Sequence, residues 1–454
     1  MEKKLSDKIS LLITALGLLV LFTAFFQWIM TKNSIEWWSW MAALTSVVLA
    51  SVIYIKFVPI WIEFWQKSED TDCKAVVKAS QYTYIKIFLG CTAYCLLVLV
   101  LIFLFRYING YSHTFAQSMQ VWRETDANHF QDIAREWYLS EGEWDRLVQL
   151  AFLPGYPIAI KLMSLLTGDY YLAGFAVSVI SFGAAGCVFY KLLRLDCDHK
   201  TAVRTLKYLC IFPATLFFAG PMSESLFLLL YLSSLYCIRT KRWLLGGVLG
   251  GYATFTRSLG ITLVVPVILE CVRDVINSGQ DKIINADTVK KAFSVLIVPL
   301  GFLAYCGINY TVSGDFFKFM EYQRVHWSQN LGWFFNTASY QTELVVSNWG
   351  QNFKIIAGLW LPSVIMYFAS LLIILFASNK LRPSYTAWFI AYFVTATGVT
   401  WLISGPRYYS ALMVLPIALG QITKNKTADF VLTACCIILN IAYLYVFSVR
   451  WYVW

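Results

Sequence analysis

Acidic and histidine side chains are concentrated in one segment of the chain, residues 108–149. It contains seven acids and two of the four histidines: Glu124, Asp126, Asp132, Glu136, Glu141, Glu143, Asp145, His113 and His129. A carboxylate placed beside a substrate can act as a general base, and a histidine can position it or contact phosphate. Acids have little influence on membrane topology, so this concentration favours a chemical role for the segment.

Asp126 lies on the apolar side of a helix expected between residues 122 and 138. The members of this apolar stripe recur at three- and four-residue steps: Trp122, Asp126, His129, Phe130, Ile133 and Trp137. Burial tends to raise the pKa of a carboxyl group, which would suit a general base. The alternative is that Asp126 is a first-turn acid favoured by the helix dipole.

Three further charges stand alone inside apolar sequence. Glu224 is the only charge between Tyr208 and Ile238, Arg257 is the only one between Trp243 and Leu269, and Arg407 follows a Gly-Pro pair. A charge within a membrane span is costly and is a functional hypothesis by default. The other interpretation is a structural ion pair between Glu224 and Arg257.

The remaining sequence predicts a membrane protein built from helices. Of 454 residues, 59% are hydrophobic and 14% are charged. The uncharged runs are close to the ~20 residues that a helix needs to cross a bilayer; they are 9–30, 87–105, 170–190, 292–314, 355–379, 384–406 and 430–449. The net charge of +10 comes from short basic loops, which is typical of cytoplasmic loops and does not indicate nucleic acid. The eleven cysteines form neither a metal motif nor a disulfide pattern.

We expect one membrane domain over residues 1–454, with additional N-terminal spans in 1–82. Spans near 9–30, 37–62 and 83–107 place the loop 108–149 outside the cytoplasm, and counting back from the C-terminus places the loop 315–352 there too. The basic loops between these two segments are expected in the cytoplasm, but counting every hydrophobic segment as one span does not place them there. At least one segment is therefore broken or re-entrant, and the candidates are 151–167, with its two prolines, and 243–269, with Arg257.

Five short segments, in order, carry a resemblance to a known family. They are Asp126-Ala-Asn-His129-Phe130-Gln-Asp132-Ile133-Ala134, Ala151-Phe-Leu-Pro-Gly-Tyr-Pro157, the proline-led run Phe212–Phe227 that contains Ser223-Glu224-Ser225, Thr256-Arg257-Ser258-Leu259-Gly260, and Gly314-Asp315-Phe-Phe-Lys-Phe319. Together they resemble the PIG-V family of mannosyltransferases, of the GT-C class. Thr125, Trp137, Met222 and Leu259 depart from the family pattern, which leaves the sugar and the acceptor open.

The resemblance implies an all-α GT-C-type bundle of about 11–13 transmembrane helices whose extracytoplasmic loop bears amphipathic helices. It also implies an inverting transfer of a hexose, most often mannose, from a polyprenyl-phosphate donor to a lipid-linked or cell-surface glycan. Asp126 would be the general base, and Arg257 and Arg407 would hold the donor phosphate. Glu224 would orient Arg257 or bind a sugar hydroxyl, and His129 would position Asp126 or contact phosphate.

Two further residues are candidate substrate contacts. Tyr156 lies in the proline-rich segment after the acidic loop, and His326 lies with Trp327 in the loop 315–352. No cofactor is implied, although a divalent cation bound by the acids of 108–149 stays open. We expect a bacterial plasma membrane with the active site facing outside. The alternatives are a lipid-linked sugar flippase or transporter, and a scaffold subunit without activity.

Overall fold

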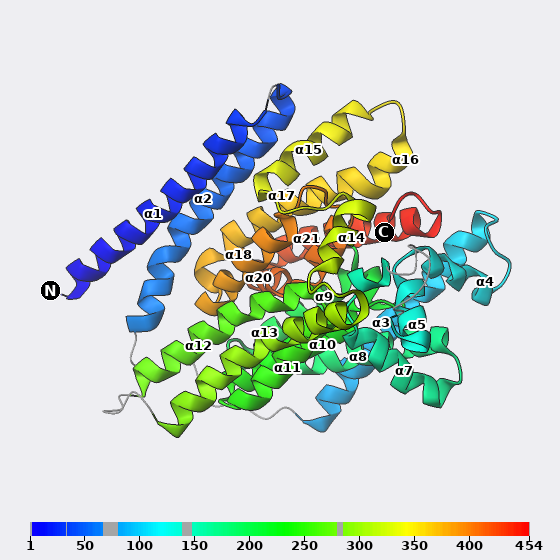
Figure 1. Cartoon of the computed structure of the whole chain (residues 1–454), viewed down its shortest axis with the longest axis horizontal. Coiled ribbons are helices and arrows are strands. Elements are labelled where there is room, and N and C mark those ends of the chain that lie inside the picture. Colours follow the sequence, from blue (N-terminus) through cyan, green and yellow to red (C-terminus); the bar gives the residue numbers. More distant parts are fainter. Residues whose placement is uncertain (1, 33, 67–79, 139–147, 279–284, 454) are drawn as a thin grey trace.

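The computed structural model describes residues 2–32, 34–66, 80–138, 148–278 and 285–453 (Figure 1). Within these ranges the regular elements are helices, apart from one isolated bridge between Leu331 and Val399. The expected all-α architecture is therefore confirmed.

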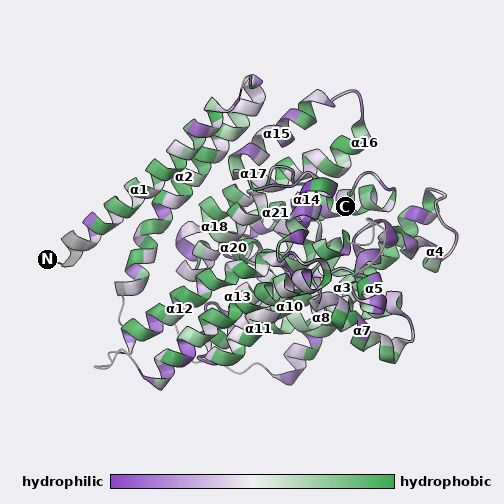
Figure 2. Ribbon diagram, in the orientation of Figure 1, coloured by the Kyte–Doolittle hydropathy of each residue, from purple (hydrophilic) through white to green (hydrophobic). Residues whose placement is uncertain are grey.

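Seven helical segments among the described residues are long and apolar enough to cross a membrane. They are Ser6–Met30 in α1 (Glu2–Met30), Trp37–Trp65 in α2 (Trp37–Gln66), α3 (Gln81–Ile108), α8 (Tyr170–Leu193), α13 (Ala286–Ser313), Phe353–Lys380 around α17 (Leu361–Ala377), and α21 (Lys426–Ser448). Hydrophobic residues run along the length of α1, α2 and α3 (Figure 2). The chain is an integral membrane protein, and these seven segments are the long apolar spans of its described part.

The other apolar segments form short or interrupted helices. They are α7 (Gly155–Thr167), α9 (His199–Ile211), α10 (Glu224–Arg239), α11 (Trp243–Thr256), α12 (Val264–Asn277), α18 (Pro383–Thr397), α19 (Gly405–Ser410) and α20 (Val414–Ile422). At ~1.5 Å per residue, a helix of about fourteen residues reaches only ~21 Å, short of the ~30 Å hydrocarbon core. A simple count that treats each apolar run as one regular, full-length span is therefore not suited to these segments.

The break expected in 243–269 is confirmed. Helix α11 stops before Arg257, whose backbone is extended (φ −146°, ψ 135°), and a 3₁₀ helix, Ser258–Leu263, leads into α12. The glycine face of α11 packs against α13. A Cβ on Gly301 would lie 1.8 Å from the carbonyl oxygen of Gly251, so only glycine allows this close backbone approach. The contact fixes the end of α11, and hence Arg257, against α13.

The expectation of one continuous span over 384–406 is wrong. Helix α18 ends at Thr397, and the chain is not helical again until Gly405. Backbone groups left free by this break find partners in the segment around residues 330–337: Gly332 donates its N–H to the Gly398 carbonyl at 2.8 Å, and Thr400 donates to that of Asn330 at 2.8 Å. Irregular backbone is tolerated at membrane depth when protein supplies such partners.

The two segments expected as outer loops contain helices. The acidic segment forms α4 (Phe115–Met119), a 3₁₀ turn (Gln120–Glu124) and α5 (Ala127–Glu136). The single helix expected over 122–138 is therefore interrupted at Thr125 and Asp126, while Glu141, Glu143 and Asp145 lie outside the described residues. The segment 315–352 forms α14 (Lys318–Trp327) and α15 (Phe334–Ser347).

The N-terminal hairpin of α1 and α2 lies along one side of the molecule, away from α5 (Figure 1). It contacts α15 and α17 through polar side chains as well as apolar ones. Trp28 donates its indole N–H to Asn336 Oδ1 at 2.9 Å, and the hydroxyls of Ser46 and Tyr367 lie 2.5 Å apart. The additional N-terminal helices are thus packed against the second of the two expected outer segments.

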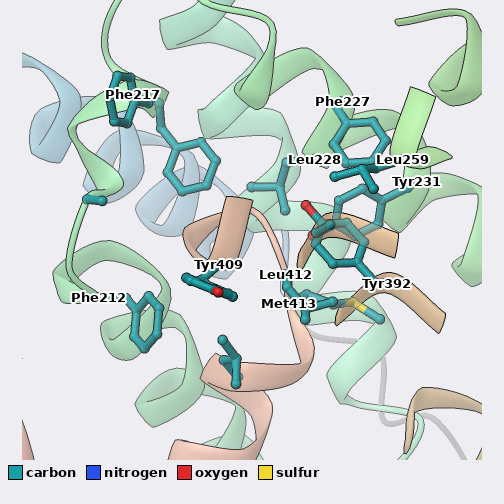
Figure 3. Packing of buried hydrophobic residues seen from close by; sticks show 14 of the residues in the cluster. Phe212, Phe217, Phe227, Leu228, Tyr231, Leu259, Tyr392, Tyr409, Leu412 and Met413 are labelled. Carbon is teal, nitrogen blue, oxygen red and sulfur yellow. The ribbon is translucent and has the colours of Figure 1, made fainter. Parts of the chain in front are cut away.

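The core behind the helix breaks is rich in aromatic side chains. Phe227, Tyr231, Leu259 and Tyr392 lie together in Figure 3 and come from α10, the 3₁₀ helix after Arg257, and α18. All four are at most 6% exposed. This packing holds the interrupted segments in fixed positions relative to one another.

Candidate active site

Four helix interruptions bring four charged side chains together. Asp126 immediately precedes α5, Glu224 is the first residue of α10, Arg257 follows the last residue of α11, and Arg407 lies in the short helix α19. Each charge sits at a helix end or in a one-turn helix, where the backbone departs from a regular span. The convergence of residues 126, 224, 257 and 407 was expected from the sequence and is observed.

The four side chains form a chain of alternating charge. The Arg407 guanidinium donates through Nη1 to Asp126 Oδ2 at 2.5 Å and through Nε to Glu224 Oε1. Arg257 Nη1 donates to the same Glu224 oxygen and to Ser223 Oγ, the latter at 3.0 Å. The ion pair between Glu224 and Arg257, which the sequence left as an alternative, is therefore present, and Arg407 extends it to Asp126.

Beside this chain lies a cavity of about 490 Å³. Three of the four charged residues line it, namely Asp126, Arg257 and Arg407, whereas Glu224 lies behind them with no exposed surface. The cavity is of the size that takes a small ligand or one or two sugar units, since ligand pockets range over ~300–1,000 Å³. Glu224 is thus placed to hold the two arginines and not to meet a ligand.

Aromatic side chains form part of the wall of the cavity. The His129 ring stacks on Phe152 with centroids 4.5 Å apart and an interplanar angle of 17°, and Phe152 meets Trp327 edge-on at 5.9 Å. All three line the cavity. Helix α14, which carries Trp327, therefore contributes to the lining of the cavity.

The charges around Asp126 reverse the expectation for its pKa. Burial acts to raise the pKa of this carboxyl, but attraction and a hydrogen bond from Arg407, helped by His129 and Arg257, bring it below its ordinary value of 3.8. The sequence placed Asp126 on an apolar face but could not show that an arginine 281 positions away would pair with it. Asp126 is therefore ionised at neutral pH. Burial lowers the pKa of His129, so its ring is neutral there.

Two expected substrate contacts lie outside the cavity lining. Tyr156 is fully buried, and its hydroxyl bonds the Gly174 carbonyl at 2.9 Å and Ser178 at 2.8 Å. The structure thus gives Tyr156 a packing role against α8 and corrects the expected substrate contact. His326 stands next to Trp327, with ring centroids 5.5 Å apart, and it does not itself line the cavity.

Several lining residues were not predicted as site residues. They are Thr256, Ser258, Gln323, Gln329, Ser404 and Tyr408. Thr256 and Ser258 belong to the family-like segment around Arg257. Ser404 and Tyr408 flank Arg407, so an unusual charge in an apolar run could have pointed to them. Gln323 and Gln329 come from α14 and its end, and nothing in their spacing distinguishes them.

No group of three or more His, Cys, Asp or Glu side chains suited to hold a metal ion occurs within the described ranges. At the site itself, arginines pair with both carboxylates. The donor set seen in this part of the chain is therefore one that favours an anion rather than a cation.

Comparison with known proteins bears on the same residues. The family described as mannosyltransferase (PIG-V) matches residues 105–325. Over this region the chain is PIG-V-like. The match contains Asp126, His129, Glu224 and Arg257, whereas Arg407 lies outside it. The PIG-V-like region thus contributes three of the four paired charges, and the fourth is contributed by the C-terminal part of the chain.

A human protein is similar to this chain over 153 residues. GPI alpha-1,6-mannosyltransferase 2 from Homo sapiens is 31% identical over 153 residues, which are 31% of this chain and 29% of the human protein. Among solved structures, the crystal structure of the Archaeoglobus fulgidus oligosaccharyltransferase in the apo form is similar over 82% of this chain and 56% of that one. The TM-score is 0.42 and the sequence identity is 11%.

Proposed function

We propose that this protein is an inverting glycosyltransferase that moves a hexose from a polyprenyl-phosphate donor to a hydroxyl of a lipid-linked or cell-surface glycan. The PIG-V-like region favours mannose as the hexose. The observation that carries the proposal is the cavity in which an ionised, partly exposed carboxylate, Asp126, lies beside two arginines. A base and an anion site side by side are what transfer of a sugar from a phosphate ester requires.

In this mechanism the acceptor oxygen attacks the anomeric carbon of the donor sugar. Asp126 takes the proton from the acceptor hydroxyl, a bond forms between that oxygen and the anomeric carbon, and the bond from this carbon to the phosphate oxygen breaks. The electron pair leaves with the polyprenyl phosphate. Arg257 and Arg407 balance the charge that develops on the leaving group.

Aromatic side chains in the cavity wall favour a sugar as ligand. Phe152 and Trp327 line the cavity, and aromatic rings can contact the apolar faces of a hexose. Gln323 and Gln329 offer amide donors and acceptors to its hydroxyls. Donor and acceptor would then meet in the cavity, between the start of α5 and the broken helices that carry the arginines.

The site is proposed to face outside a bacterial plasma membrane. Support comes from the lysines near the N-terminus and from the short basic loops, which favour the cytoplasm. An epitope inserted at the exposed turn around Gly110 should be labelled in intact cells. Labelling only after the cells are broken would reverse the orientation.

The test of function is transfer by purified protein in detergent. Labelled polyprenyl-phosphate-mannose is mixed with membrane lipid and glycan extracts, and a labelled product is expected for the native chain. Asp126→Asn should lower its formation by at least about 100-fold, the usual scale for loss of a general base. Glu136→Gln makes the same change on the exposed side of α5 and should have no effect.

Two outcomes would contradict the proposal. Absence of any transferred sugar with intact protein would favour the flippase or transporter, because detergent abolishes compartments but not chemistry. Transfer that survives Asp126→Asn unchanged would remove Asp126 as the base. The folding of each variant is checked by its elution as a single species and by its thermal midpoint.

A further inference from the structure

Glu224 and Asp126 both form ion pairs with the arginines of the site, but Glu224 is bound more firmly than Asp126. Glu224 has no exposed surface and accepts hydrogen bonds from both arginines. The Asp126 side chain is 32% exposed and bonds one arginine, Arg407. Breaking a fully buried ion pair costs far more than breaking a partly exposed one. Asp126 is therefore the partner that can be exchanged.

The arginines themselves are not free to move toward an incoming anion. The Arg407 side chain is 6% exposed, and its guanidinium lies over the Phe217 ring at 5.4 Å. Arg257 lies over the Tyr408 ring at the same distance. Both cations are fixed by ring contacts and by Glu224, so a ligand must come to them.

The charges of the four paired residues cancel. Asp126 and Glu224 carry two negative charges, and Arg257 and Arg407 carry two positive ones. Nη1 of Arg407 donates to Asp126, and Nε of the same guanidinium donates to Glu224. An anion therefore gains the full charge of Arg407 only when it takes the place of one of these carboxylates.

We propose that a phosphate ester entering the cavity displaces Asp126 from Arg407, so that binding of the ligand itself frees the carboxylate. The inference rests on the proposed function in taking this ester to be a polyprenyl phosphate. Once displaced, Asp126 has lost its nearest counter-charge and is a stronger base, now beside a bound phosphate ester. Arg407 therefore binds the Asp126 carboxylate before the ligand enters and binds the phosphate afterwards. The carboxylate becomes an effective base only when there is a donor to react with.

The exchange predicts that removing the competitor tightens ligand binding. Polyprenyl monophosphate is titrated into detergent-solubilised protein, and its Kd is compared between the native chain and Asp126→Asn. The Kd of Asp126→Asn should fall roughly three- to tenfold, on the scale of a partly exposed charge pair. A Kd that is unchanged or raised would overturn the proposal.

A matched control separates exchange at Arg407 from a general loss of negative charge. Glu124 also lines the cavity, but it pairs with Arg450 and not with Arg407. Glu124→Gln should leave the Kd within about twofold, the change expected for a screened, exposed acid. If Glu124→Gln tightens binding as much as Asp126→Asn does, the effect is not exchange and the proposal fails.

A double-mutant cycle tests the same point through the arginine. In an Arg407→Gln background, Asp126→Asn should no longer tighten binding, because there is no shared donor left to release. Tightening that persists in this background contradicts the exchange. If Arg407→Gln does not fold, the comparison of Asp126→Asn with Glu124→Gln still decides.

The phosphate could belong to the donor or to the head group of an acceptor lipid. Polyprenyl monophosphate and phosphatidic acid are therefore titrated in parallel into the same variants. Tightening for the first alone assigns the exchange to the donor, and tightening for the second alone assigns it to an acceptor. These titrations need no sugar transfer. A failure of the proposed function would appear as inactive native protein, whereas a failure of the exchange would appear as an unchanged Kd.

Discussion

Helix α10 carries an ionic cluster at each of its ends, and the two clusters are built from the same residue types. At its first residue, Glu224, lies the site with Asp126, Arg257 and Arg407. At its last residue, Arg239, lies a second cluster with Asp196, Glu270 and Arg382. Sixteen residues, or ~24 Å of helix, separate them. Each cluster joins two acids to two arginines from distant parts of the chain.

The second cluster is saturated. Arg239 meets both oxygens of Asp196 at 2.8 and 2.9 Å, and Arg382 meets both oxygens of Glu270 at 2.6 and 2.8 Å. Ser384 adds a hydroxyl to Glu270 at 2.5 Å. Paired forks of this kind are the strongest form of the arginine–carboxylate contact. This cluster has the geometry of a structural clamp between α10, α12 and α18.

The site cluster leaves bonding capacity unused. Oε2 of Glu224 is buried and has no hydrogen-bond partner within the described residues, and Asp126 meets Arg407 through one oxygen. The site cluster also borders a cavity. A structural ionic cluster and a candidate active site can therefore contain the same number of charges. They are distinguished by incomplete pairing of the carboxylates next to a cavity.

The largest effect expected from this comparison is on the stability of the clamp. Arg382→Gln leaves Glu270 buried without its main counter-charge, which typically costs about 3–5 kcal/mol. The thermal midpoint of the detergent-solubilised variant should therefore fall by many degrees, while transfer per folded molecule at low temperature stays near that of the native chain. A variant that is stable but inactive would mean that the second cluster takes part in function.

The corresponding change at the site should act on binding instead. Arg257→Lys keeps the charge beside Glu224 but loses the planar fork that suits a phosphate. We expect the Kd for polyprenyl phosphate to rise about tenfold, with a much smaller loss of thermal stability than Arg382→Gln causes. Unchanged affinity would make Arg257 a second structural arginine and remove the contrast between the clusters.

The low pKa of Asp126 gives a pH prediction with a defined sign. Because the pKa in the folded protein lies below 3.8, the pairing stabilises the fold above the unfolded-state pKa and is lost as the pH falls through the folded-state pKa. The charged groups around Asp126 are Arg407 and Arg257, with His129 and Asp132 nearby.

The acid limb of kcat/KM, which reports the free enzyme, should therefore lie below about pH 4 or outside the measurable range. If the ligand displaces Asp126 from Arg407, the acid limb of kcat should lie at a higher pH than that of kcat/KM, because kcat reports the bound state. Glu136→Gln serves as the control and should shift neither limb. Coincident limbs in the native chain would argue against the exchange.

The sequence was sufficient to predict which charges matter, but not how they pair. Glu224, Arg257 and Arg407 stood out because a charge in an apolar run is costly whatever its partner. Pairing depends on the helix breaks before Glu224 and after Thr397, which bring residues far apart in the chain together. The break at Gly398 could not be predicted, because its freed backbone groups bond to the distant segment near Gly332.

The same limit explains the errors at Asp126 and Tyr156. Periodicity placed Asp126 on an apolar face, and its burial was expected to raise its pKa. The pKa is lowered instead, because Arg407 pairs with Asp126. This pairing could not be predicted, since Arg407 is 281 positions away in the chain. Tyr156 was a candidate because it lies in the proline-rich, family-like segment that follows the acidic loop. Its hydroxyl instead bonds Gly174 and Ser178 on α8, a contact that only the packing of α7 on α8 creates.

The smallest expected effect is that of removing divalent cations. The two site carboxylates are neutralised by arginines, so a cation would have to displace a guanidinium from a fixed position, and a hard cation prefers several oxygen ligands that this cluster does not offer. Transfer of labelled mannose should therefore be unchanged by EDTA, and added Mg²⁺ or Mn²⁺ should not increase it. Loss of activity in EDTA that Mn²⁺ restores would show that the site needs a divalent cation in addition to the arginines. Under the same conditions, Arg382→Gln should respond no differently from the native chain, because the second cluster has no part in the proposed reaction.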